Sequence, residues 1–212
     1  HNIKIRQTAW LRADYVIRDE ELGILEKAVQ AGLCQVMIGV ERPDEISLRY
    51  LNKHSNGPDV TAKAFEIFRK KYPSVFTIGS VIFGIWDETK KSLNELSRYQ
   101  YKVGMDYCFF IPLTPNPGTE VYENARKQGI IEITDPRAYN FHTPVMCTKR
   151  FSAKQLERLY FKLVFRISYD RFVHHLKQIL SIREKRRRKV FWSLLKHGTK
   201  ITKRFLANRL RH

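Results

Sequence analysis

The sequence predicts an α/β fold, in which parallel strands alternate with helices, followed by a basic α-helical extension. Short apolar runs rich in β-branched residues occur at 35–40 and 75–84, as in strands buried on both faces of a sheet. Helical patterns separate the strands, which begin 30 to 40 residues apart, as in βαβ units. Four such units fit the later, C-terminal portion of a TIM-like (β/α) barrel, or a half-open sheet, with its active face at the carboxyl ends of the strands.

The first two predicted strands flank one helix. Residues 5–11 form the first strand, and a helix over 19–31 is opened by an acidic run and closed by Gly32. The apolar run QVMIGV at 35–40 is the second strand. A further helix over 58–72 begins at a proline, whose fixed φ suits the first helical turn, and a second proline ends it.

The second half of the predicted sheet follows the same order. Residues 75–84 form the third strand, and Asp87 caps a helix over 88–102 that has a glycine just beyond its end. Residues 106–111 form the fourth strand, and a short helix over 118–128 follows it.

The positive charge of the chain is concentrated behind residue 149. Residues 1–149 carry 20 Lys and Arg against 18 Asp and Glu, whereas residues 150–212 carry 19 against 3. The chain therefore divides into a nearly neutral domain, 1–149, and a basic extension, 150–212. Ser152 caps a long helix there, and the run REKRRRK at 183–189 precedes a stretch of alternating apolar and basic residues.

The composition excludes several classes of protein. No run of 18 uncharged apolar residues occurs, and the first ten residues lack the apolar core of a signal peptide. The three cysteines are too scattered for a disulfide framework or a Cys-x-x-Cys metal site, so we expect a reducing compartment, the cytoplasm. Basic neighbours favour a lowered thiol pKa for Cys147, whereas Cys34 and Cys108 are expected to be small buried hydrophobic residues.

Polar residues and glycines stand directly behind three predicted strands. Glu41 follows the second strand, Gly84 ends the third, and the loop PLTPNPG at 112–118 follows the fourth. Taken singly, each has a structural explanation: an acid in a first helical turn, an unstrained turn, and a surface loop. Because parallel strands end at one edge of a sheet, together they point to a binding site at that edge.

Three segments carry a resemblance to a known family: AGLCQVMIGVERPDEISLRYLNKHSN at 31–56, GSVIFGIWDET at 79–89 and DYCFFIPLTPNPGTEVY at 106–122. In order and spacing, residues 8–122 resemble the later half of the barrel of the radical S-adenosylmethionine (radical SAM) enzymes. Those enzymes commonly show IGVES and LNK, then a strand end G-x-FI-x-G-x-PGET, then TP-x-PGT. The resemblance is nearest to the cobalamin-binding branch that includes anaerobic magnesium-protoporphyrin monomethyl ester cyclase.

The resemblance implies an enzyme that cleaves S-adenosylmethionine (SAM) reductively at a [4Fe-4S] cluster to form a 5′-deoxyadenosyl radical. That radical would start the methylation, cyclisation or rearrangement of a substrate that the sequence does not identify. A small molecule, or a lipid-like or porphyrin-like compound, is the expected substrate class. The fold would hold SAM in line with the reacting atoms and keep water away from them.

The resemblance also implies which residues bind SAM. Glu41 matches a polar contact near the ribose, Lys53 a residue that faces the carboxylate, and Ser80 a small polar residue near the ribose. Arg12 matches a polar strand-end position near the methionine part. These types suit a charged ligand, because Glu accepts hydrogen bonds from a diol and Lys pairs with a carboxylate. A glycine that admits the ligand to the backbone and the loop beside the adenine complete the candidate set: Gly84, Leu113, Thr114 and Pro115.

The sequence departs from the family pattern in two respects. WDET at 86–89 stands where the family has PGET, and the motif C-x-x-x-C-x-x-C, whose thiolates hold the cluster, does not occur. A Gly-Gly-Glu segment that meets the SAM amino group is also missing. In the family both belong to the first two barrel strands. We therefore expect this chain to be the carboxyl-terminal piece of a longer enzyme, inactive alone. Its cluster ligands, and a domain for cobalamin if cobalamin is used, would lie in the missing N-terminal part. No catalytic residue and no metal ligand is assigned to this chain.

Other interpretations stay open. Aromatic residues among the lysines and arginines of 150–212 suggest a non-catalytic module that binds the anionic inner face of a membrane. Nucleic acid is a less favoured partner for the same residues. The extension would otherwise fold over the barrel, with its charges in solvent or facing an acidic missing domain. Another α/β barrel acting on a phosphorylated metabolite is the last alternative, although the chain has no Gly-rich phosphate loop.

Overall fold

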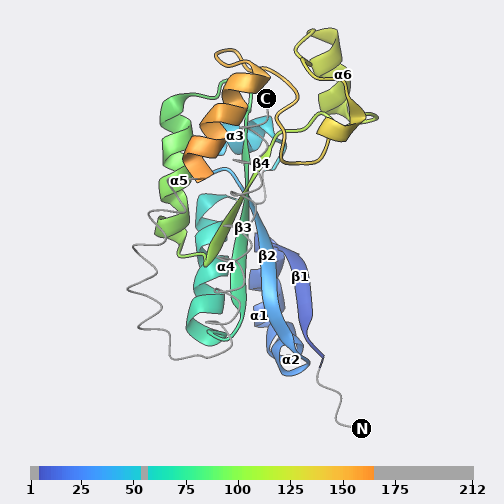
Figure 1. The fold of residues 1–212 in the computed structure, drawn as a ribbon. Helices are drawn as coiled ribbons and strands as arrows, with labels where there is room; N and C mark the ends of the chain where they lie inside the picture. Colours follow the sequence, from blue (N-terminus) through green and yellow to red (C-terminus); the bar gives the residue numbers. More distant parts are fainter. Residues whose placement is uncertain (1–4, 54–56, 165–212) are drawn as a thin grey trace, which may run out of the picture.

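The computed structural model describes residues 5–53 and 57–164. Its centre is a sheet of four parallel strands in the order β1-β2-β3-β4 (Figure 1). The strands are Gln7–Arg12 (β1), Leu33–Glu41 (β2), Phe76–Phe83 (β3) and Tyr107–Pro112 (β4). Helices join each neighbouring pair, as parallel strands require. The predicted α/β fold class, with parallel strands as in part of a TIM-like barrel, is confirmed.

The helices of the described residues are Ala13–Glu21 (α1), Ile24–Gln30 (α2), Glu45–Tyr50 (α3), Pro58–Lys71 (α4), Lys90–Val103 (α5) and Glu120–Lys127 (α6). A 3-10 turn at Pro136–Ala138 and helical residues 153–164 follow them. The helices predicted over 58–72, 88–102 and 118–128 correspond to α4, α5 and α6. The short α3 was not predicted; Asp44 caps it by accepting a hydrogen bond from the Ser47 N–H at 2.8 Å.

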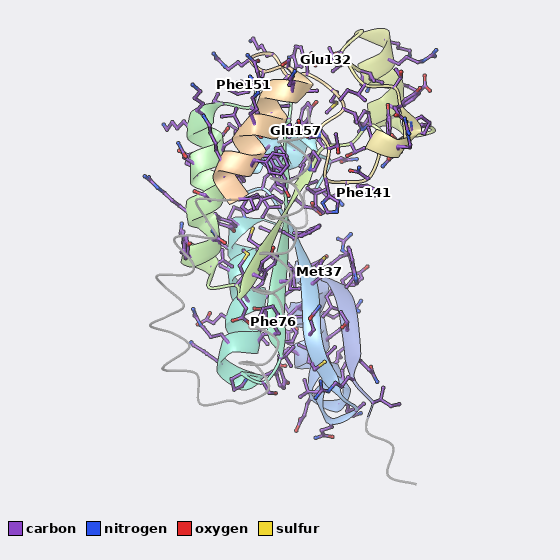
Figure 2. The ribbon with its side chains drawn as sticks, in the orientation of Figure 1. Met37, Phe76, Glu132, Phe141, Phe151 and Glu157 are labelled. Carbon is purple, nitrogen blue, oxygen red and sulfur yellow. The ribbon has the colours of Figure 1, made fainter. Side chains whose placement is uncertain are left out.

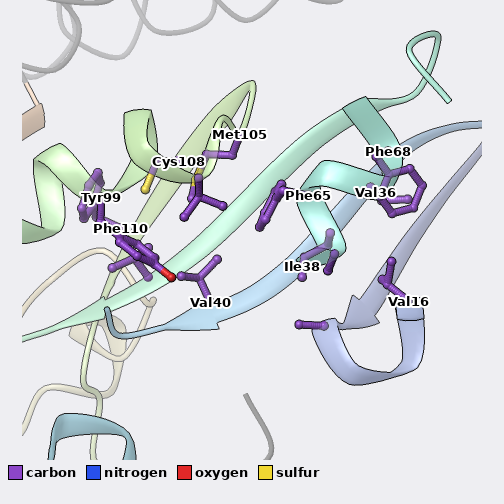
Figure 3. Packing of buried hydrophobic residues seen from close by; sticks show 14 of the residues in the cluster. Val16, Val36, Ile38, Val40, Phe65, Phe68, Tyr99, Met105, Cys108 and Phe110 are labelled. Atoms are coloured by element: carbon purple, nitrogen blue, oxygen red, sulfur yellow. The ribbon is translucent and has the colours of Figure 1, made fainter. Parts of the chain in front are cut away.

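One hydrophobic core fills the space between one face of the sheet and helices α1, α2, α4 and α5 (Figure 3). Every second residue of β2 belongs to this core: Val36, Ile38 and Val40 are fully buried, and Phe65 of α4 joins them. The strand residues in between therefore point to the opposite face of the sheet. On that face Trp10 of β1 is 73% exposed. Among the described residues, helices cover one side of the sheet and no helix covers the other, which we call the accessible face.

The single helix predicted over 19–31 is wrong in its extent. Helix α1 begins directly after β1, because Ala13 and Val16 are fully buried in the core. Gly23 then adopts a left-handed conformation with φ 69°, which a residue without a Cβ accepts at little cost, and α2 starts behind it. Gly32 does follow the second helix, at φ 108°, where a Cβ atom would lie 2.1 Å from the Ile5 carbonyl oxygen.

Thr89, and not Asp87 as predicted, caps α5. The Thr89 hydroxyl accepts a hydrogen bond from the Ser92 N–H at 3.0 Å, and the Ser92 hydroxyl accepts one from the Thr89 N–H at 2.9 Å. This reciprocal arrangement is a capping box. Asp87 is displaced from the role because the chain first turns inward to bury the side chain of Glu88, and the helix starts only after that turn.

The chain behind α6 folds back on itself. Ile131 and Met146 form an isolated antiparallel bridge, and Glu132, which is labelled in Figure 2, accepts a hydrogen bond from the Ala153 N–H at 2.8 Å. Ser152 caps the helix at 153–164, as predicted, since its hydroxyl accepts a hydrogen bond from the Gln155 N–H at 3.2 Å.

The helix at 153–164 packs against the end of β3. The ring of Tyr160 stacks on that of Phe83, with centroids 5.0 Å apart and planes 2° apart. Leu156 and Leu163 are buried, and Leu163 belongs to the hydrophobic core. Residues 165–212, with the basic run at 183–189, lie outside the described residues. The domain boundary at 149 and the character of the extension therefore stay predictions. Among the described helices, none has the length and apolar character needed to cross a membrane.

Candidate functional site

The accessible face of the sheet carries polar residues near the carboxyl ends of the strands. In the register of the sheet, Arg12 of β1 pairs with Gly39 of β2, Gly39 with Ser80 of β3, and Ser80 with Phe109 of β4. These residues alternate with core residues, so their side chains share the accessible face. Gly39 has no side chain, so none stands on β2 between Arg12 and Ser80, whose strands lie about 10 Å apart.

Glu41 ends β2 in a strained turn. Its φ is 60°, and the N–H of Arg42 donates to the carbonyl of Val40 at 2.8 Å. A three-residue turn with positive φ at its centre is the rare form of the γ-turn. A non-glycine residue held in such a conformation costs on the order of 1–3 kcal/mol and is found most often at functional sites. The pairing of β2 with β3 shifts at this point: Gly39 pairs with Ser80, but Glu41 pairs with Val81, so the alternation of the two faces is interrupted at Glu41.

Lys53 is the nearest charged partner of Glu41. Its ammonium nitrogen lies 3.7 Å from a Glu41 carboxylate oxygen, and the side chains are 46% and 15% exposed. Burial raises the pKa of the Glu41 carboxyl above its ordinary value, and the positive charge of Lys53 opposes that rise. Lys53 is placed there by the end of α3, where its N–H donates to the Leu48 carbonyl at 2.8 Å. The structure thus brings together two of the candidate residues, an acid and a base.

The ends of β3 and β4 form a second group of candidate residues. Gly84 has φ 80°, and the Leu113 N–H donates to the Phe83 carbonyl at 2.8 Å, which holds the two strand ends together. The Thr114 hydroxyl donates to the Pro112 carbonyl at 3.0 Å, and Pro115 is buried. This loop therefore offers backbone groups, rather than charged side chains, to a ligand.

Arg12 stands apart from these groups. Its guanidinium donates to both carboxylate oxygens of Asp14, at 3.1 and 2.9 Å, and lies 5.0 Å from the centre of the Tyr15 ring. Asp14 raises the pKa of the guanidinium. Arg12 shares the register row of Ser80, but in this structure its guanidinium is paired with Asp14.

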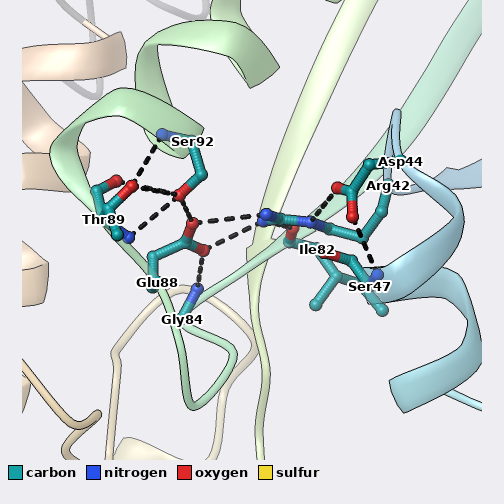
Figure 4. Close-up of polar contacts among 8 residues, drawn as sticks. All are labelled: Arg42, Asp44, Ser47, Ile82, Gly84, Glu88, Thr89 and Ser92. Atoms are coloured by element: carbon teal, nitrogen blue, oxygen red, sulfur yellow. Dashed lines mark hydrogen bonds and ion pairs between the residues drawn. The ribbon is translucent and has the colours of Figure 1, made fainter.

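Two residues that the sequence did not single out form the most buried polar contact of the region (Figure 4). Arg42 is 2% exposed and Glu88 is 0% exposed. They form a two-pronged ion pair with nitrogen–oxygen distances of 2.9 and 3.3 Å. Glu88 also accepts hydrogen bonds from the Gly84 N–H at 2.8 Å and from the Ser92 hydroxyl. The only sequence signal was a charged residue behind each of two strands, and nothing in the sequence pairs residues that lie 46 positions apart.

Metal ligands are not grouped in the part of the chain that the structure describes. Residues 5–53 and 57–164 contain no cluster of three His, Cys, Asp or Glu side chains that would hold a metal ion. Cys108 is buried, as predicted, whereas Cys34 is half-buried, with its thiol 3.4 Å from the Gln7 carbonyl oxygen. The predicted lowered pKa of Cys147 is wrong: burial and the neighbouring Glu132 carboxylate raise the pKa of this thiol.

A cavity of about 450 Å³ lies elsewhere, between α6 and the chain that follows it. Its walls are built mainly from apolar and aromatic side chains: Pro117, Tyr122, Arg126, Gly129, Ile131, Thr134, Pro136 and Tyr139. None of the candidate residues lines it. The candidate site is therefore the open edge of the sheet and not this cavity.

Comparison with known proteins gives three informative relatives. An uncharacterized methyltransferase of Pyrococcus horikoshii is 29% identical over 134 residues, which are 63% of this chain and 28% of the relative. The anaerobic magnesium-protoporphyrin IX monomethyl ester cyclase of Cereibacter sphaeroides is 30% identical over 145 residues, 68% of this chain and 22% of the relative. The bacteriochlorophyllide d C-8(2)-methyltransferase of Chlorobaculum tepidum is 30% identical over 122 residues, 57% of this chain and 27% of the relative.

The matched part is a minor share of each relative. This chain spans about a quarter of the length of these curated proteins. No family profile matches the chain. The relatives are nevertheless enzymes that transfer a methyl group or close a ring, according to their names.

Proposed function

We propose that this chain forms the SAM-binding part of a radical SAM enzyme that methylates or cyclises its substrate. The observation that carries the proposal is the half-buried Glu41, held in a strained turn at the carboxyl end of β2 and paired with Lys53. A protein keeps a strained, partly desolvated acid where a ligand uses it. The names of the relatives, two methyltransferases and a cyclase, support the reaction class.

The residues present fit SAM. On this proposal Glu41 accepts hydrogen bonds from the ribose diol, and Ser80 of the neighbouring strand β3 lies near the same ribose. Lys53 pairs with the carboxylate of SAM, and the backbone from Gly84 to Leu113 lies beside the adenine. SAM itself supplies the activated methyl or adenosyl group. This chain binds and orients SAM. The sheet keeps water from the side of SAM that lies against it.

The described residues do not fit a [4Fe-4S] cluster, because they hold no group of three suitable ligands. The proposal therefore assigns the cluster ligands, and a cobalamin site if cobalamin is used, to residues outside the described ones. Its substrate would be a small molecule, or a lipid-like or porphyrin-like compound.

Titration calorimetry of SAM against the 212-residue chain tests the proposal. We expect binding, and an affinity about tenfold lower in Glu41→Gln, because a hydrogen bond to a charged group is lost. Glu45→Gln is the matched control, since Glu45 lies at the start of α3 in an exposed pair with Arg49. Absence of binding by the unaltered chain, or equal affinities of the two variants, would contradict the proposal.

A second proposal concerns the basic extension: residues 150–212 contact an anionic membrane surface. Nineteen basic residues against three acidic ones support it. We expect the chain to bind vesicles that contain phosphatidylserine, to ignore neutral vesicles, and to lose binding as salt is raised. Replacing the basic residues of 183–189 by glutamine should abolish it. Binding that favours an oligonucleotide over vesicles would replace the membrane by nucleic acid as the partner.

A further inference from the structure

A buried ion pair connects the carboxyl ends of β2 and β3, and one of its members, Arg42, is the residue next to Glu41. Arg42 donates to Glu88 through two nitrogens and to the Ile82 carbonyl of β3 at 3.2 Å. Glu88 is in turn anchored by the Gly84 N–H at 2.8 Å and by the hydroxyl of Ser92. Arg42 cannot move without breaking several hydrogen bonds in a water-free interior.

The same arginine controls both members of the acid–base pair. Its backbone N–H closes the turn in which Glu41 sits, at 2.8 Å from the Val40 carbonyl. Its Nε lies 3.8 Å from the Asp44 carboxylate, and this carboxylate caps α3. Helix α3 leads directly to Lys53. Glu41 is therefore fixed through the backbone of its own turn. Lys53 is fixed through the N-terminus of α3, the helix that precedes it.

We propose that the Arg42–Glu88 ion pair is the positioning element of the candidate site: it keeps Glu41 in its strained turn and Lys53 beside it. The inference rests on the proposed function only for what Glu41 binds. Arg42 and Glu88 are buried and act through Glu41, so they are positioning residues and not catalytic ones. A buried ion pair commonly adds little net stability compared with uncharged residues of similar shape. Its presence here is explained by the geometry that it imposes on its neighbours.

Hydrogen exchange without any ligand is the first test. Arg42→Met with Glu88→Gln removes both charges, and the glutamine oxygen can still accept the bond from the Gly84 N–H. Arg42→Lys, which keeps the charge and loses the two-pronged geometry, is the milder variant if the first does not fold. We expect the backbone amide of residue 42 to exchange about tenfold faster in these variants than in the unaltered chain, relative to the amides of β2 and β3 within the core, because the strained turn is released. An equal change at all these amides would overturn the inference.

A double-mutant cycle with SAM is the second test. Arg42→Lys should weaken SAM binding about tenfold when residue 41 is Glu, and should have a clearly smaller effect in the Glu41→Gln background, where only the placement of Lys53 is left to lose. Equal loss in both backgrounds means that Arg42 does not act through Glu41, and it would overturn the inference. Failure of the unaltered chain to bind SAM would overturn the proposed function instead, and the exchange measurement would then decide the positioning role alone.

Discussion

Neutralising Glu88 should destabilise the protein more than any other conservative change at this edge of the sheet. Glu88 and Arg42 are 0% and 2% exposed, so Glu88→Gln leaves a buried guanidinium without its counter-charge. Removal of one partner of a buried ion pair costs about 3–5 kcal/mol. We expect the lower end, about 3 kcal/mol, because glutamine keeps the shape and can still accept the hydrogen bond from Gly84.

Urea unfolding followed by circular dichroism measures this loss. With a denaturant slope of about 2–3 kcal/mol per molar, the midpoint should fall by about 1–1.5 M. Glu45→Gln, in an exposed pair with Arg49, should change stability by less than about 0.5 kcal/mol. The double variant Arg42→Met, Glu88→Gln should regain most of the loss, because no buried charge remains. A loss below about 1 kcal/mol for Glu88→Gln would refute the reasoning.

Three further predictions concern the pH response, the helix cap and one glycine. Because burial raises the pKa of Glu41 above its ordinary 4.5, the folded state loses stability as the pH rises through that raised pKa. Glu41→Gln should therefore be more stable than the unaltered chain at pH 7 and lose this advantage below about pH 4. Urea midpoints at the two pH values measure the difference, and equal midpoints of the two proteins at pH 7 would contradict the prediction. Thr89→Ala should cost about 1 kcal/mol in thermal or urea unfolding, whereas Asp87→Ala should be nearly neutral, and the reverse order would restore Asp87 as the cap. Gly32→Ala should lower the free energy of unfolding by more than about 2 kcal/mol, since the added Cβ meets backbone at a positive φ. Gly57→Ala has free space around its Cβ and should be almost as stable as the unaltered chain. Similar urea midpoints of the two variants would count against the turn described at Gly32.

The sequence allowed the strands and most helices to be predicted because those depend on local patterns. The apolar, β-branched run at 35–40 and the proline that begins α4 each act within a few residues, although the run predicted burial on both faces of β2 and the structure buries every second residue. Predictions failed where tertiary contacts override the local signal. Helix α1 starts early because Ala13 and Val16 fill the core, and the α5 cap moves to Thr89 because Glu88 is drawn inward.

The candidate site could be predicted in its place but not in its contacts. Parallel strands end at one edge, so a common location for Glu41, Ser80 and Gly84 follows from chain order alone. The pairing of Glu41 with Lys53 depends on the path of α3, which was not predicted. The Arg42–Glu88 pair depends on two loops that meet across 46 positions, and no pattern within either loop specifies its partner.

The packing of residues 153–164 decides where the polypeptide can be cut. A cut behind residue 149 would strip Leu156, Tyr160 and Leu163 from the surface that they cover, and would leave Phe83 without its stacked ring. Each buried leucine contributes about 1.5–3 kcal/mol, so the loss approaches the whole stability of a typical domain, about 5–15 kcal/mol. Biochemists who wish to separate the basic tail from the sheet should therefore place the stop codon no earlier than after residue 164, so that the shortened protein keeps the helix at 153–164.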